Sequence, residues 1–80
     1  MELRYAIVLK GTGCYRDGTP HNTVHAVHNK KELLELWSKL ITIHLGHPYS
    51  VEDLNSGLTV LSGEMHLDDF KTLKKLSEEN

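Results

Sequence analysis

The sequence contains few cysteines, prolines and aromatic residues. Its 80 residues include one cysteine and two prolines, and only 6% are aromatic. A single cysteine excludes an internal disulfide framework and favours a reducing, cytoplasmic setting. No apolar run reaches the roughly 18 residues that span a bilayer, and the N-terminal residues lack the pattern of a signal peptide. We therefore expect a cytoplasmic protein without a membrane partner.

Neither sign of charge dominates the chain. The net charge is −2, with six basic and four acidic residues in 1–47 against three basic and seven acidic residues in 48–80. Nucleic-acid-binding domains usually carry a strong basic excess, so this balance argues against nucleic acid as the partner. The chain is 39% hydrophobic and 25% charged, which is typical of globular proteins. Its length suits a single compact domain over residues 1–80.

The first third of the chain predicts a long β-hairpin. Apolar and polar residues alternate over residues 2–10, which indicates a strand. Asp17-Gly18 is a strong two-residue turn signal because both residue types tolerate positive φ. A turn at this point sets Leu9 opposite Ala26 and predicts a second strand over residues 23–28. Residues 11–22 then form a glycine-rich hairpin loop.

The clearest predicted element is a helix that follows this hairpin. Asn29 stands where an N-cap belongs, and Glu32 three residues later completes a capping pattern. Apolar residues then recur at helical spacing as far as Leu45, and Gly46 provides a stop. Trp37 lies at the centre of the apolar stripe, so we expect its side chain to be buried against a sheet.

The remaining chain predicts a third strand and a second helix. Residues 50–54 resemble a single capped helical turn, residues 58–62 read as a strand, and residues 67–76 read as a helix. Residues 77–80 are expected to fray. The predicted fold is therefore a small α+β domain of order β-β-α-β-α. Its three-stranded mixed sheet carries two main helices on one face, with the third strand parallel to the first.

Residues suited to metal binding or catalysis are present but incomplete as sites. Cys14 and His21 face each other in the predicted hairpin and are weak candidates for metal ligands. Two ligands do not make a structural zinc site, so we expect no metal and no cofactor. A Cys14 thiol with His21 as its base lacks a recognised catalytic motif, so no catalytic residue is assigned. The six histidines also leave a pH-dependent switch open.

These observations favour a small non-enzymatic protein that binds or regulates a protein partner. Tyr15 and Arg16 are the candidate contacts in the hairpin loop, because both residue types are enriched at interface hot spots. Leu36 and Ile43 widen the apolar arc of the first helix and are further candidates. They suggest a homodimer formed through this helix or through a free sheet edge. The alternatives are a nucleic-acid-binding accessory protein and a small thiol- or metal-dependent enzyme.

Overall fold

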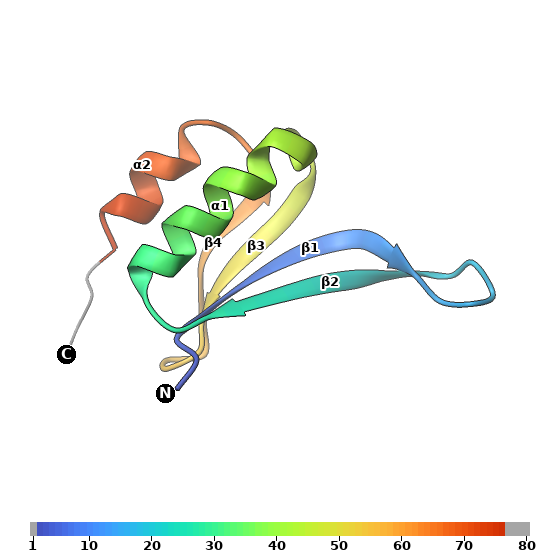
Figure 1. Ribbon diagram of the computed structural model, residues 1–80, viewed down its shortest axis with the longest axis horizontal. Coiled ribbons are helices and arrows are strands. Elements are labelled where there is room, and N and C mark those ends of the chain that lie inside the picture. The colour runs from blue at the N-terminus through green and yellow to red at the C-terminus, as the bar shows by residue number, and fades with distance from the viewer. Residues whose placement is uncertain (1, 77–80) are drawn as a thin grey trace.

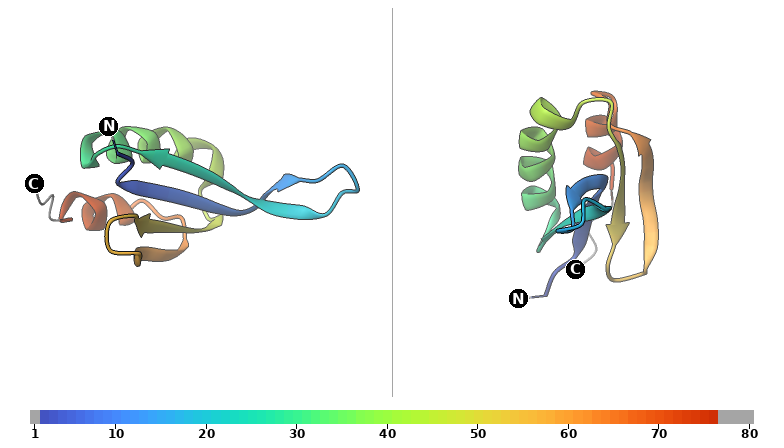
Figure 2. Two further views of the ribbon diagram at one scale, coloured as in Figure 1. Left: turned by 90° about the horizontal axis from the view of Figure 1, so that it is seen from below. Right: turned by 90° about the vertical axis from the view of Figure 1, so that its right-hand side faces the viewer.

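The computed structural model describes residues 2–76 and shows a four-stranded sheet with two helices on one face (Figures 1 and 2). The expected frayed segment, residues 77–80, lies outside the described residues. Along the chain, the described elements are β1 (Tyr5–Cys14), β2 (Pro20–Val27), α1 (Lys30–His44), β3 (Pro48–Asp53), β4 (Leu58–Glu64) and α2 (Asp69–Lys74). No helix in this part of the chain is long and apolar enough to cross a membrane. The α+β class is confirmed.

The sheet has order β2-β1-β3-β4, and every pair of neighbours is antiparallel. The prediction of a three-stranded mixed sheet is therefore wrong, because the residues predicted as a helical turn form strand β3. The apolar residues Tyr49 and Val51 are fully buried and alternate along the chain with the polar residues Ser50 and Glu52, which is the two-residue period of a strand. Ser50 is buried as well, so both faces of β3 are covered at this point. Pairing with β1 on one side and β4 on the other outweighs the local capping pattern.

The hairpin forms, but its predicted register is wrong. The Tyr15 N–H donates to the Thr19 oxygen and the Gly18 N–H donates to the Tyr15 oxygen, which closes a loop of three residues instead of two. Gly18 takes a φ of 89°, as this loop type requires at its last residue. A second shift between Leu9 and Gly13 moves the register further, so Leu9 lies opposite Thr23.

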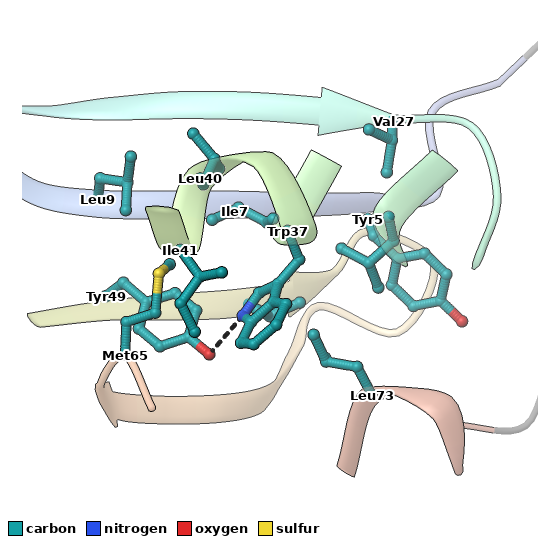
Figure 3. Close-up of a cluster of buried hydrophobic side chains, with 12 residues drawn as sticks. Tyr5, Ile7, Leu9, Val27, Trp37, Leu40, Ile41, Tyr49, Met65 and Leu73 are labelled. Carbon is teal, nitrogen blue, oxygen red and sulfur yellow. Dashed lines mark hydrogen bonds between the residues drawn. The ribbon is translucent and has the colours of Figure 1, made fainter. Parts of the chain in front are cut away.

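Helix α1 begins as predicted and supplies much of the core. The Glu32 N–H donates to Asn29 Oδ1 at 2.9 Å, which confirms the N-cap. Trp37 is 3% exposed and lies between α1 and the sheet, so its predicted burial is confirmed (Figure 3). Its buried neighbours come from both helices and three strands. They include Tyr5, Ile7, Leu9, Leu33, Leu40, Tyr49, Val51 and Leu73.

Helix α2 is shorter than the predicted span of 67–76, because contacts with the rest of the protein fix both of its ends. The Asp69 carboxylate accepts hydrogen bonds from the Tyr49 hydroxyl at 2.7 Å and from the His66 N–H at 3.1 Å. At the other end, Lys30 Nζ donates to the carbonyl oxygens of Lys74 and Leu76. A cation at the C-terminus of a helix also suits the helix dipole.

Candidate functional site

The most prominent surface feature is a two-stranded arm, residues 10–22, formed by the outer parts of β1 and β2. Strand β3 pairs with β1 only as far as Leu9, so beyond this residue the β1–β2 ribbon leaves the body (Figures 1 and 2). The molecule is consequently elongated, at 43 × 27 × 19 Å. No residue of the arm is buried, and all those from Cys14 to Pro20 are exposed. The arm therefore adds nothing to the hydrophobic core.

Side chains fix the base of the arm where the register shifts. Thr12 Oγ1 donates to Thr23 Oγ1 at 2.6 Å, and the Gly11 N–H donates to Asn22 Oδ1 at 3.1 Å. Gly11 has a φ of 69°, which a glycine adopts without strain. The extra residues in β1 form a bulge, and bulges bend and twist a strand. The sequence thus sets the arm at a defined angle to the body.

A hydrogen bond also joins the base of the arm to the residue that precedes β3. Lys10 is the first residue beyond the β1–β3 pairing, and its carbonyl oxygen accepts a hydrogen bond of 2.6 Å from His47 Nε2. His47 stands directly before β3, between the end of α1 and the sheet. This contact fixes the position at which the arm departs from the body.

The tip of the arm presents Tyr15 and Arg16, the two contacts predicted from the sequence. Tyr15 is 62% exposed, and its ring lies 4.7 Å from the His21 ring between centroids, at an interplanar angle of 52°. Gly13 makes room for this pair, because a Cβ there would collide with the His21 ring. The packing holds one face of Tyr15 against the arm, and Arg16 at the adjacent turn position is exposed.

Asp17 is the only acidic residue of the arm, and the turn uses its carboxylate. The Thr19 N–H donates to Asp17 Oδ1 at 2.9 Å, and this hydrogen bond lowers the pKa of Asp17 below its ordinary value. The carboxylate is thus directed toward Thr19, on the far side of the turn. Arg16 provides the charge that the turn leaves available to a partner.

The other two predicted contacts lie apart from the arm, on α1. Leu36 is partly buried and packs against the core, whereas Ile43 is 76% exposed near the C-terminal end of the helix. Two further exposed leucines, Leu45 and Leu67, lie at the same end of the molecule, because the Gly46 N–H donates to the Met65 oxygen at 2.7 Å. Sequence periodicity included both leucines in the apolar patterns of the two predicted helices, but α1 ends before Leu45 and α2 begins after Leu67.

The structure does not set the proposed metal ligands opposite each other. Gly13 lies opposite His21, and Cys14 lies opposite Pro20. His21 Nδ1 hydrogen-bonds the Asn22 carbonyl oxygen at 3.0 Å, and Cys14 is a free, exposed thiol. Within residues 2–76 there is no group of three or more His, Cys, Asp and Glu residues that could hold a metal ion, and there is no pocket.

Comparison of the chain with models of known protein families, with curated proteins and with solved structures gives no match. The functional evidence therefore lies in the geometry of the arm and of the surfaces beside it.

Proposed function

We propose that this protein is a small, non-enzymatic binding protein that engages a protein partner through its arm, with Tyr15 and Arg16 as the principal contacts. The observation that carries the proposal is an ordered, projecting ribbon without a buried side chain. Both helices and the body parts of the strands contribute buried or partly buried residues to the core.

The energetics of the arm support a role in contact. Fixing the backbone of each residue costs about 1–2 kcal/mol in conformational entropy, and an isolated two-stranded ribbon is marginally stable at best. The arm buries no side chain in the core, so it recovers little of this cost by burying apolar surface. A partner that contacts the arm would supply the favourable interactions that offset this entropy cost.

The tip suits a protein surface better than a nucleic acid. Tyr15 offers an aromatic ring already held by His21, so less side-chain entropy is lost when a partner covers it. Arg16 offers a fork of donors that matches a carboxylate. The arm lacks the dense basic character of a nucleic-acid-binding surface, since its fixed cations are Lys10 and Arg16. We therefore expect the partner to present an acidic residue beside an apolar patch.

A pull-down from native lysate with two baits tests the proposal. One bait is the wild-type protein, and the other has Gly11–His21 replaced by an Asn-Gly turn, which keeps the strand pairs from Tyr5↔Val27 to Leu9↔Thr23. A protein that binds the wild type and is lost from the short-arm bait is the expected partner. Capture that is abolished by nuclease treatment would instead support the nucleic-acid-binding alternative.

Point variants then locate the contact on the purified partner. A hot-spot residue costs at least about 2 kcal/mol when truncated, so Tyr15→Ala and Arg16→Ala should each weaken binding by about 30-fold. Leu58→Ala is the matched control, because Leu58 is also highly exposed but lies on β4, away from the candidate contacts. Equal affinity of the wild-type and short-arm proteins for the partner would refute the proposal.

A further inference from the structure

Strand β2 forms an open edge of the sheet that lacks the usual protection. It pairs with β1 alone, and Pro20–Val27 contains neither an acidic residue nor a lysine or arginine, with its one proline at the first position. Exposed sheet edges normally carry charges, prolines or bulges that prevent pairing with another chain. The opposite edge, β4, does carry such features. It has Glu64, Gly63 at a φ of 124° and a register shift against β3.

The hydrogen-bond pattern of the sheet identifies the backbone groups that point outward from β2. The Thr19 oxygen accepts a hydrogen bond from the Tyr15 N–H, and the Val27 oxygen accepts one from the Arg4 N–H. The odd-numbered residues of β2 therefore direct their amide groups toward β1, where His25 lies opposite Ile7. By the same alternation, the outward N–H and C=O groups of the paired part of β2 belong to Asn22, Val24 and Ala26.

We propose that β2 pairs with the β2 strand of a second copy of this chain, antiparallel and related by a two-fold axis at Val24. The two four-stranded sheets then form one continuous sheet. Outward residues must pair with outward residues, which here sets Asn22 opposite the partner's Ala26 and forms about six backbone hydrogen bonds. A symmetric pairing of this kind closes the assembly at two copies.

The side chains of β2 suit a copy of themselves as the occupant of this edge. Val24 is 59% exposed and lies opposite Val8 on the sheet face that the helices leave uncovered. Only the register centred on Val24 brings the two Val24 side chains together, which extends the Val8–Val24 pair into an apolar strip across the junction. Thr23 then lies opposite the partner's His25, so no fixed charge meets a like charge in the paired segment.

This proposal does not rest on the proposed function of the arm. Tyr15 and Arg16 lie beyond the paired segment, so both tips stay accessible in the dimer. Because the paired strands are antiparallel, the two arms leave the dimer in opposite directions. A dimer of this form would offer two binding tips to a partner, and bivalent contact raises the effective affinity.

Light scattering coupled to size-exclusion chromatography tests the pairing. We expect the wild-type protein to approach twice the monomer mass of 9.1 kDa as its concentration rises. Val24→Lys would place two positively charged side chains opposite each other at the two-fold axis. This variant should therefore keep the mass at 9.1 kDa at every concentration. Leu58→Lys is the matched control, because it adds the same charge at an exposed apolar position of the β4 edge and should still form the dimer.

Two further measurements separate the β2 edge from other routes to a dimer. Val24→Pro removes an outward N–H without removing a β1–β2 hydrogen bond, so it should also give monomers and serves if Val24→Lys fails to fold. In the wild-type dimer, the Val24 and Ala26 amides should exchange hydrogen more slowly than in dilute monomer. A wild-type mass that stays at 9.1 kDa, a Val24→Pro protein that dimerises normally, or unprotected amides in the dimer would each overturn the proposal.

Discussion

Replacement of Trp37 by alanine should strongly destabilise this protein. The indole lies at the centre of the buried face of α1 and packs against Phe70 with 5.4 Å between ring centroids. Its Nε1–H donates to the Tyr49 hydroxyl oxygen at 3.1 Å (Figure 3). Truncation of a buried aromatic side chain to alanine costs about 3–5 kcal/mol, because the lost transfer energy is joined by the cost of a cavity.

The hydrogen bond to Tyr49 should not raise the cost beyond that range. After truncation the Tyr49 hydroxyl still donates to Asp69 Oδ2 at 2.7 Å, so it is not left as an unpaired buried donor. Domains of this size have an unfolding free energy of about 4–12 kcal/mol, at roughly 0.05–0.15 kcal/mol per residue. A loss of about 3–5 kcal/mol therefore removes between roughly a quarter and all of this stability.

Urea unfolding followed by far-ultraviolet circular dichroism is the appropriate assay, because Trp37 is the only tryptophan and the variant has no indole fluorescence. With a slope of about 1 kcal/mol/M, the midpoint should fall by roughly 3 M or more. Ile43→Ala on the same helix should change stability by less than about 0.5 kcal/mol, because its side chain is exposed. Equal midpoints for Trp37→Ala and the wild type would refute the assigned core.

Three further substitutions probe separate contacts. Tyr49→Phe removes the acceptor of the buried indole N–H and should cost about 1–3 kcal/mol in the same unfolding assay. The His28 N–H donates a hydrogen bond to the Glu32 carboxylate and lowers the pKa of Glu32. The ionised carboxylate therefore stabilises the folded state above the ordinary glutamate pKa, and this stabilisation is lost as the pH falls through the lowered pKa. Glu32→Gln should flatten that acid-side decrease in the unfolding midpoint. Gly13→Ala should displace the His21 ring, seen by NMR, and weaken partner binding without changing core stability.

The helix could be predicted from the sequence because its signals are local. Asn29 and Glu32 stand three residues apart, Trp37 lies on the same stripe as the other buried residues of α1, and Gly46 follows the last turn. Each signal involves residues within one or two helical turns of each other. The structure differs from the predicted N-terminus of this helix in one contact. The Glu32 carboxylate accepts a hydrogen bond from the His28 N–H, whereas the capping pattern predicts one from the N–H of the N-cap residue Asn29.

Strand β3 could not be predicted in the same way, because its conformation depends on distant partners. Ser50 and Asp53 locally satisfy the pattern of a capped turn. Strand β1, more than thirty residues earlier, and β4 after it supply the ladders that hold this segment extended. Because the sequence-based prediction has one strand too few, it sets the strand at residues 58–62 directly beside β1. In the structure β3 lies between them, and β4 runs in the same direction as β1 without pairing with it. One local ambiguity thus changed the predicted topology of the whole sheet.

The sequence predicts the position of the arm but not its loop length or its strand register. Asp17-Gly18 correctly marks the turn, yet a two-residue and a three-residue loop share this signal, and the choice shifts every facing pair. The bulge between Leu9 and Gly13 has only glycines as its sequence signal, and glycines mark many other structures. The separation of Cys14 from His21 follows directly from this altered register, so the metal hypothesis depended on a pairing that the protein does not adopt.

Strand β2 contributes to both proposed binding surfaces, the arm and the open sheet edge. The residues that would contact a partner at the tip differ from those that would pair in the dimer. Its outer part supports the arm, and its central residues Asn22, Val24 and Ala26 form the open edge. The Thr12–Thr23 hydrogen bond lies where the arm meets the body, so it fixes the arm relative to that edge. A dimer joined at Val24 would therefore hold its two arms at a defined spacing, and a partner with two matching sites would gain affinity only if it fits that spacing.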